Sequence, residues 1–250
     1  FDLMGHHMRR NLLKVRDTLR TLTPARDGVD GTKIYIYGEG CDFGEVGWNA
    51  RGVNASQGNM AGTGIGTFSD RLRDAARGGS GFGDPREQGF VTGLWYEPNG
   101  HWQGREENLR THLLYLTDLV RLGLAANLAD YELVTSWGAR LRGDRIDYNG
   151  QPAGYAREPH ETVSYLEAHD NETLFDAIQM KAAPEASLAD RVRMHNLGVS
   201  LVMLGQGIPF FQAGQDLLRS KSLDRNSYDS GDWFNKVDWT GQSNNWGVGL

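Results

Sequence analysis

Apolar residues recur at helical spacing in four stretches of the chain. In the first stretch they fall at positions i, i+3, i+7 and i+10, which places them in one stripe along a helix. The stripes are Leu12, Val15, Leu19 and Leu22; Leu109, Leu113, Leu116 and Val120; Leu174 and Ile178; and Val192, Val199, Val202 and Met203. The last stretch follows a helix-start sequence, SLAD at 187–190, and becomes apolar almost all round towards its end. We therefore expect four helices, the last of them well buried.

Short apolar runs between these stretches are typical of strands. The clearest are 33–38 (KIYIYG), 161–168 (ETVSYLEA) and 207–214 (GIPFFQAG). Residues 1–4 resemble the end of a further strand, and 122–131 is a weaker candidate. Helices that alternate with short buried strands predict an α/β fold with a parallel sheet.

The glycine-rich stretch 50–104 shows neither the helical nor the strand period, so we expect a long irregular insertion. Loops of this length inside a compact domain are usually functional. Arginines alternate with aspartates over 69–79, which predicts a solvated helix face whose charges pair with one another.

Composition narrows the class of partner. The chain has 250 residues, of which 39% are hydrophobic, enough for a sizeable core. Its net charge of −6 argues against nucleic-acid and anionic-membrane partners, and no apolar run is long enough to cross a bilayer. Cys41 is the single cysteine, which excludes an internal disulfide and a cysteine-based zinc site.

Aromatic residues add a hint about the ligand. Five of the seven tryptophans lie in loop-like sequence within two residues of a glycine or asparagine: Trp48, Trp95, Trp102, Trp233 and Trp246. Tryptophans in such positions often provide stacking surfaces for sugars, and they equally often pack a loop onto the core. The 33 glycines, close to twice the usual share, predict many tight turns and irregular loops.

Carboxylates follow several of the predicted strands. Asp2, Glu39 and Asp170 each stand at a strand end, and Asp216 follows Gln215 after the run 207–214. In parallel α/β folds the chemistry is placed where strands end and loops begin. Paired carboxylates serve glycoside hydrolysis, and gathered carboxylates also bind divalent metal ions. The metal interpretation favours spacings such as D-x-D, which none of these strand ends offers.

Four long motifs resemble the pullulanase and limit dextrinase type of debranching enzyme in the α-amylase superfamily. They are IYIYGEGCDFGEV (34–46), NARGVNASQGNMAGTGIGTFSDRLRDAARGG (49–79), VSYLEAHDNETLFD (163–176) and GIPFFQAGQDLLRSKSLDRNSYDSGDWFNKVDW (207–239). The resemblance implies that residues 1–250 form the C-terminal half of a catalytic (β/α)₈ barrel, from strand four to strand eight. The Gly-rich insertion would follow strand five, and the N-terminal part of the barrel and a C-terminal β-domain would lie outside the chain.

The resemblance also implies roles for individual residues. Asp2 matches the nucleophile, Glu39 the general acid/base, and Asp170 the third acid that stabilises the transition state. His169 resembles a histidine that binds sugar hydroxyls, whereas His6 resembles a structural residue. A general acid must begin protonated, so we expect a raised pKa for Glu39, caused by partial burial and the ionised Asp2.

Further positions match the family less directly. Arg225 resembles a donor-side sugar contact, and Phe43 and Phe82 are expected to line the acceptor side. Cys41 stands where the family usually has a tryptophan, which removes a flat stacking surface. The arginine that normally stands two residues before the nucleophile would precede Phe1.

The implied activity is hydrolysis of α-1,6-glucosidic branch links in pullulan or limit dextrins, with retention of configuration. No cofactor is required for this chemistry; a structural calcium ion fits the superfamily, although no motif specifies a site. The implied partner is a branched α-glucan. Secreted, cytoplasmic and plastid locations are all compatible with the sequence. Alternatives are an isoamylase-type or branching activity, a non-catalytic α-glucan-binding protein and an inactive truncated fragment. Because half a barrel lacks closure, we expect the isolated 250-residue chain to be molten or aggregated, without activity.

Overall fold

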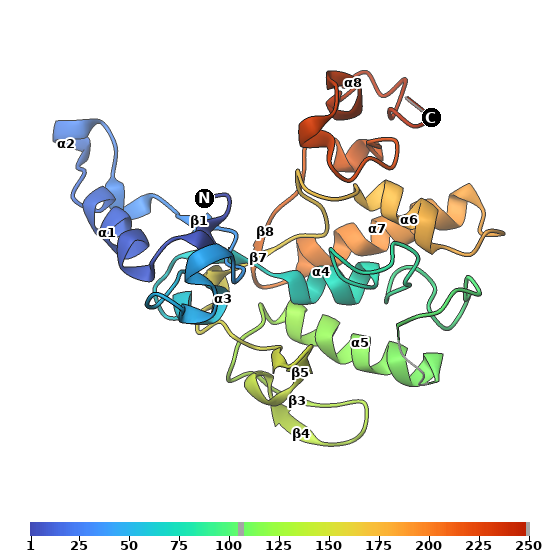
Figure 1. The fold of residues 1–250 in the computed structure, drawn as a ribbon, viewed down its shortest axis with the longest axis horizontal. Helices are drawn as coiled ribbons and strands as arrows, with labels where there is room; N and C mark the ends of the chain where they lie inside the picture. Colours follow the sequence, from blue (N-terminus) through green and yellow to red (C-terminus); the bar gives the residue numbers. More distant parts are fainter. Residues whose placement is uncertain (105–107, 249–250) are drawn as a thin grey trace.

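A four-stranded parallel sheet lies at the centre of the computed structural model, which describes residues 1–104 and 108–248. The strand order is β1-β2-β7-β8, and every neighbouring pair is parallel (Figure 1). The strands are β1 (Tyr37–Gly38), β2 (Gly66–Phe68), β7 (Thr162–Ser164) and β8 (Ile208–Pro209). The mixed α/β class is therefore confirmed, whereas membership of this sheet in an eight-stranded barrel stays a prediction.

Helices surround the sheet. The α-helices are α1 (Arg9–Leu19), α2 (Pro24–Asp27), α3 (Gln57–Met60), α4 (Asp70–Arg77), α5 (Leu109–Leu124), α6 (Leu174–Lys181), α7 (Leu188–Leu204) and α8 (Asp232–Asn235). The four helices predicted from apolar spacing correspond to α1, α5, α6 and α7. Side chains cap three of them, since Asn108, Thr173 and Ser187 each accept a backbone N–H from the first turn.

Short 3₁₀ helices and two hairpins complete the elements. The 3₁₀ helices are Met4–His6, Gly31–Lys33, Gly44–Asn49, Gly143–Arg145, Pro159–Glu161, Gln215–Leu217 and Ser227–Asp229. The hairpins pair β3 (Glu132–Val134) with β4 (Arg140–Arg142), and β5 (Asp147–Tyr148) with β6 (Gln151–Pro152).

Two of the predicted strands are not strands. Residues 122–131 begin as the end of α5 and continue as irregular chain, with one isolated bridge between Leu128 and Ala156. Residues 1–4 form a turn that runs into a 3₁₀ helix, although the Phe1 nitrogen donates to the Tyr37 carbonyl at 2.7 Å. The amino end thus lies beside β1 without a regular ladder.

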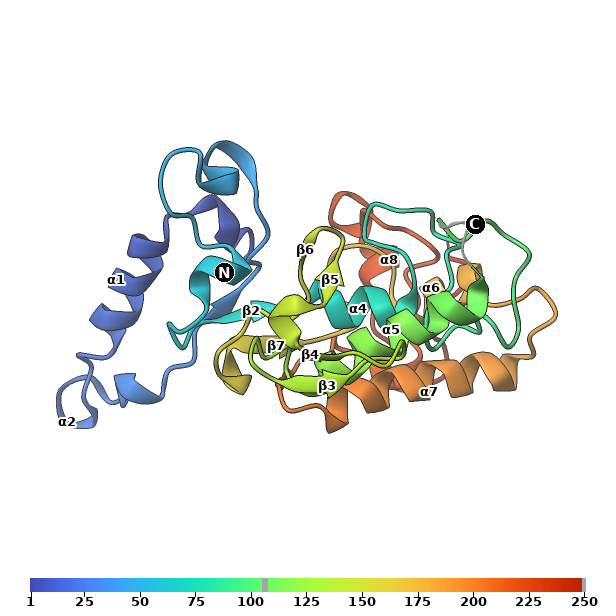
Figure 2. The same ribbon diagram turned by 90° about the horizontal axis from the view of Figure 1, so that it is seen from below.

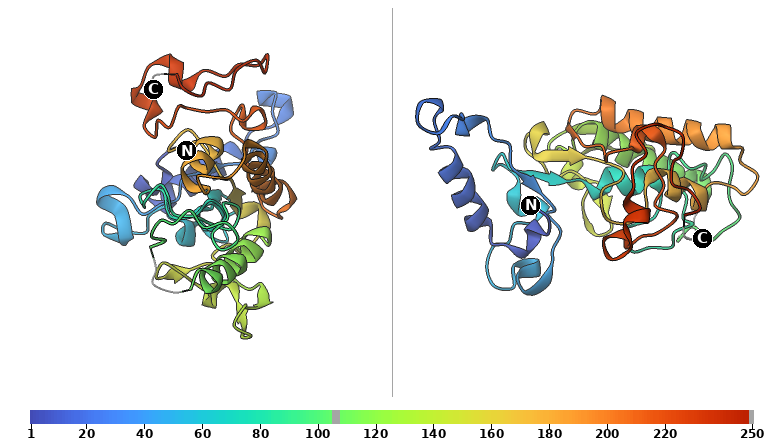
Figure 3. Two further views of the ribbon diagram at one scale, coloured as in Figure 1. Left: turned by 90° about the vertical axis from the view of Figure 1, so that its right-hand side faces the viewer. Right: turned by 90° about the horizontal axis from the view of Figure 1, so that it is seen from above.

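The core has two parts. The larger part lies among α4, α5, α6 and α7 and includes Leu72, Leu119, Leu122, Leu166, Leu174 and Val202. The smaller part packs beneath α1 and consists of Met4, Leu12, Ile36, Ala55, Met60 and Ile65. Figures 2 and 3 show α1 and α2 on one side of the sheet strands and the longer helices α5 and α7 on the other.

The expectation of a solvated helix over 69–79 is wrong. Helix α4 is buried, and Arg71 is only 3% exposed. The helix packs against α5, where Gly123 gives room to Leu72, since a Cβ there would lie 2.8 Å from the Leu72 Cδ1. Pairing keeps the buried charges satisfied: Arg71 lies 2.6 Å from Asp70. Because 50–104 holds β2, α3 and α4, it is also less irregular than expected.

The expectation that the last predicted helix is well buried is also wrong for its end. Helix α7 buries one face, where Gly198 approaches Leu166, but Met203 and Leu204 are 62% and 73% exposed. Apolar residues all round a helix imply burial only where other elements cover every face. No other part of the described chain covers the outer face of this helix end.

Candidate active site

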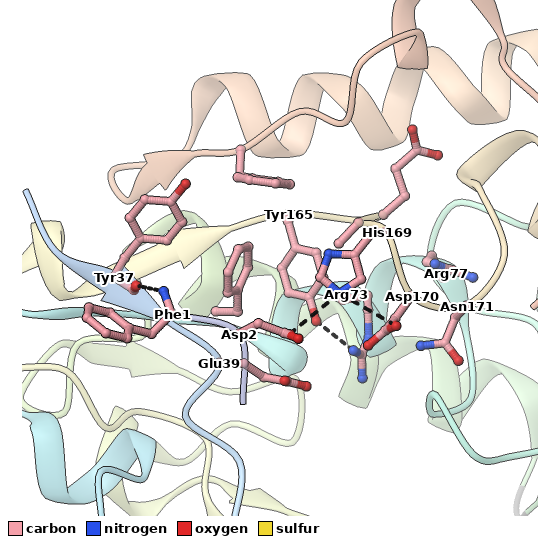
Figure 4. Close-up of a pocket in the computed structure, with 14 residues that line it drawn as sticks. Phe1, Asp2, Tyr37, Glu39, Arg73, Arg77, Tyr165, His169, Asp170 and Asn171 are labelled. Atoms are coloured by element: carbon pink, nitrogen blue, oxygen red, sulfur yellow. Dashed lines mark hydrogen bonds and ion pairs between the residues drawn. The ribbon is translucent and has the colours of Figure 1, made fainter. Parts of the chain in front are cut away.

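A cavity of about 290 Å³ opens at the carboxyl ends of the parallel strands. Its lining includes the three acids predicted at strand ends, Asp2, Glu39 and Asp170, together with His169. They come from three separate segments of the chain, the amino end, the end of β1 and the segment after β7 (Figure 4). The structure therefore brings these three acids to one cavity, and their catalytic roles stay predictions.

The two glycines beside Glu39 are required by close packing. A Cβ on Gly38 would collide with the Phe1 carbonyl oxygen and lie 2.9 Å from the Met4 Cβ. A Cβ on Gly40 would lie 2.8 Å from the Thr67 Cγ2. Both glycines therefore let neighbouring segments approach the strand end that carries Glu39.

Backbone hydrogen bonds tie the Asp2 segment to Glu39. The Glu39 N–H donates to the Phe1 carbonyl at 3.0 Å, and the Gly5 N–H donates to the Glu39 carbonyl at 2.9 Å. The Leu3 N–H donates to the Glu39 Oε2 at 3.2 Å. Asp2 lies between these contacts, so its position relative to Glu39 is set by the backbone on both sides.

His169 lies between two of the acids. Its Nε2 is 3.5 Å from the Asp2 Oδ1 and 3.6 Å from the Asp170 Oδ1, contacts drawn as dashed lines in Figure 4. All three side chains are more than half exposed to the cavity and solvent. A group that enters the cavity can therefore reach them directly.

The environment raises the pKa of Glu39 above its ordinary value. Partial burial is the largest cause, and the carboxylates of Asp170 and Asp2 add to it. The Leu3 N–H and His169 act in the opposite direction. The shift has the direction predicted from sequence, and it favours a protonated Glu39 beside its neighbouring acids.

Aromatic rings form the other wall of the cavity. Phe68, in β2, packs edge-on against Tyr165 and Phe210 with ring centroids 4.9 and 5.0 Å apart, and Tyr37 lies 5.7 Å away. Arg73, from α4, donates to the Tyr165 hydroxyl at 2.6 Å. Sequence reasoning missed these residues, although the aromatic residues within the strand-like runs were a usable signal. Phe68 lies in the stretch that we expected to be irregular.

The remaining predicted site residues lie outside this cavity. Arg225 pairs with Glu172, Nε to Oε1 at 2.9 Å, in a neighbouring small pocket. Phe43 stacks on His6 with ring centroids 5.2 Å apart, in keeping with a structural His6. Phe82 is 95% exposed. Their roles as sugar contacts stay predictions.

Asp216, the acid that follows the strand-like run 207–214, also lies outside the cavity. Asp216 is exposed in the 3₁₀ helix that follows β8, and it does not line the cavity. Gln215 is buried, and its carbonyl oxygen is 2.9 Å from the His195 Nε2. Cys41 is partly buried, and burial raises the pKa of its thiol to about 12.

Residues 1–104 and 108–248 contain no group of three or more His, Cys, Asp or Glu side chains that could hold a metal ion. The structural calcium ion stays a prediction. Within the same ranges no helix has the length and apolar character needed to cross a membrane.

The chain is similar in sequence to segments of larger known proteins. It is 51% identical over 251 residues to "Pullulanase 1, chloroplastic" of Arabidopsis thaliana and 48% identical over 254 residues to "Pullulanase" of Klebsiella pneumoniae. Both matches cover 100% of this chain but only 26% and 22% of the relatives. A crystal structure of a maltotriose complex of PulA from Klebsiella pneumoniae matches with a TM-score of 0.90 and 48% identity, over 100% of this chain and 26% of that one. No protein-family model matches the chain.

Proposed function

Because the chain is homologous along its whole length to a segment of the pullulanases, we propose that it supplies the catalytic acids of an α-1,6-glucan debranching hydrolase. The chain spans about a quarter of the length of these relatives, so the activity proposed is that of the full-length protein. The substrate class is a branched α-glucan such as pullulan or a limit dextrin, and hydrolysis proceeds with retention.

The observation that carries the chemistry is that three acids from distant segments share one cavity, and the raised pKa of Glu39 supports it. Glu39 starts protonated and gives its proton to the glycosidic oxygen as the link breaks. The Asp2 carboxylate attacks the anomeric carbon and forms a covalent glycosyl ester. Glu39, now ionised, takes a proton from water, whose oxygen attacks the anomeric carbon and releases Asp2.

The other cavity residues hold the substrate. Asp170 and His169 accept and donate hydrogen bonds to sugar hydroxyls and stabilise the oxocarbenium-like transition state. The rings of Phe68, Tyr165 and Phe210 provide apolar surface for the carbon face of a glucose unit. Arg225, Phe43 and Phe82 are proposed as contacts further along the glucan chain.

The proposed fold of the full-length protein is a (β/α)₈ barrel in which β1, β2, β7 and β8 belong to the second half. Two features support it. The sheet is parallel, and in sheet order its strands run β1 to β8. Strands β1 and β8 each pair on one side only among the described residues, so each has an edge that further strands can join.

The proposal is tested in the full-length protein with pullulan. We expect hydrolysis, initial formation of the α-anomer by proton NMR, and loss of turnover in Glu39→Gln by a factor of about 10³ or more, with glucan binding retained. Glu45→Gln is the matched control, because Glu45 is an exposed acid near Glu39 in sequence that pairs with Arg51 at 2.9 Å. A Glu39→Gln variant with near-normal turnover, or a β-anomer as first product, would contradict the mechanism.

A further inference from the structure

The loop 166–172 presents His169 and Asp170 to the cavity on a tightly held backbone. His169 and Asp170 are exposed, whereas Leu166, Glu167 and Glu172 are buried. The backbone next to Asp170 is also unusual, since Asn171 has a φ of +58°. A loop in which exposed side chains stand between buried ones needs partners that fix its main chain.

Arg77, the last residue of α4, supplies such contacts at both ends of the loop. Its Nη1 donates to the Leu166 carbonyl at 2.8 Å and to the Glu172 carbonyl at 3.3 Å. Its Nη2 pairs with the Glu172 Oε2 at 3.3 Å. The side chain is only 8% exposed, so these charge-assisted contacts are shielded from solvent.

Other buried groups hold the loop between these ends. The Lys221 Nζ donates to the His169 carbonyl at 3.0 Å. The Leu174 N–H donates to the buried Glu167 carboxylate. Arg77 differs from both because one planar guanidinium bonds the first and last residues of the loop. It therefore fixes the distance between the two ends of the loop that carries His169 and Asp170.

We propose that Arg77 is a positioning residue for the hydrolysis: by joining Leu166 to Glu172 it places Asp170 and His169 against Glu39 and Asp2. This inference rests on the proposed function of the cavity. Arg77 lines the cavity wall, but both of its terminal nitrogens are bonded to the loop. Its contribution to the reaction therefore passes through Asp170 and His169.

The substitution Arg77→Lys in the full-length protein tests this role. A lysine keeps the positive charge, but a single ammonium cannot reproduce the fork that bonds both carbonyls and the Glu172 carboxylate. We expect kcat to fall by about 10-fold or more with KM within about twofold, because the catalytic groups are misplaced by a fraction of an ångström. The alkaline limb of kcat/KM should move to lower pH, because the Asp170 carboxylate that raises the pKa of Glu39 is no longer held beside it.

Two controls separate positioning from general stability. Arg71→Lys changes another buried arginine of α4, one that contacts Asp70 and the Pro152 carbonyl and not the loop. It should lower the melting temperature while leaving kcat and the pH profile unchanged. On an Asp170→Asn background, Arg77→Lys should reduce the residual rate by a smaller factor than it does in the wild-type protein, since one of the two groups through which it acts is already removed.

A second variant keeps the inference testable if Arg77→Lys does not fold. Lys221→Met removes the donor to the His169 carbonyl from a different segment, and it should show the same fall in kcat and the same shift of the alkaline limb. A raised KM at unchanged kcat, an unmoved pH profile, or equal rate losses with and without Asp170→Asn would overturn the positioning role alone. If Asp170→Asn leaves kcat unchanged, the proposed function fails and the positioning role fails with it.

Discussion

Gly38→Ala is the substitution by which the packing around Glu39 can be tested most directly. Gly38 is buried at the end of β1, and an added Cβ would collide with the Phe1 carbonyl oxygen. It would also lie 2.9 Å from the Met4 Cβ and 3.0 Å from the Met4 Sδ. All of these atoms belong to the amino-terminal segment that carries Asp2, so that segment must move if alanine is accommodated.

The expected size of the effect follows from this geometry. Ordinary carbon–carbon contacts lie at about 3.5–4.0 Å, so the Met4 Cβ must retreat by roughly 1 Å. A displacement of about 1 Å in a catalytic group costs about 100-fold in rate, or about 2.7 kcal/mol in the activation barrier. Overpacking of this kind also lowers the free energy of unfolding by about 1–3 kcal/mol.

The assay is kcat for pullulan hydrolysis by the full-length protein, measured well below the melting temperature, with the melting temperature recorded in parallel. Gly58→Ala is the matched control, because a Cβ at Gly58 in α3 meets nothing within 4 Å. It should leave kcat unchanged and slightly raise stability, since alanine favours a helix over glycine. A Gly38→Ala variant with kcat within threefold of wild type would refute the view that this contact places Asp2.

Two further predictions concern buried ionisable groups. Burial raises the pKa of Glu167 to about 7 from an ordinary 4.5, so the folded state keeps a proton that the unfolded state releases, and stability should fall as pH rises from about 4.5 to 7. Urea unfolding at pH 5 and pH 8 should show this loss in the free energy of unfolding, at most about 3 kcal/mol, in the wild-type protein and not in Glu167→Gln. An equal pH dependence in the two proteins would contradict the raised pKa of Glu167. Burial raises the pKa of the Cys41 thiol to about 12. Labelling of this thiol by iodoacetamide at pH 8 should therefore be at least about 100-fold slower in the native protein than in urea. Equal labelling rates would contradict the burial of Cys41.

Much of the helical framework could be predicted from the sequence because it depends on apolar spacing. Helix α6 buries both residues of its stripe, and α5 buries Leu116 and Val120. Helix α1 buries Leu12, whereas Val15 of the same stripe is exposed. Helix α4 could not be predicted as buried in this way, since five of its eight residues are charged. Its burial depends on partners far along the chain, such as Glu172 for Arg77 and the Tyr165 hydroxyl for Arg73.

The three acids of the cavity stand where strand-like runs end, and the ends of parallel strands meet at one edge of a sheet. The same pattern also selected Asp216, which lies outside the cavity, so strand ends alone did not define the site. The aromatic wall was less accessible to sequence reasoning. Phe68 belongs to a strand of three residues that follows a glycine-rich segment, and the strand is too short to show a period. Phe82 was expected at the site but is exposed to solvent, since an aromatic residue in a glycine-rich loop need not contact the rest of the chain.

The distribution of charge around the cavity explains how one of three neighbouring acids is set apart from the other two. Arg73 and Arg77 also line the cavity, but Arg73 is bonded to Asp74 and the Tyr165 hydroxyl, and Arg77 is bonded to the loop 166–172. The strongest charged influences on Glu39 are therefore the carboxylates of Asp170 and Asp2, opposed by His169. Glu39 is the half-buried member of the three, so burial and repulsion act together on its pKa. The cluster thus favours a proton on Glu39, which is the state from which the proposed general acid must begin.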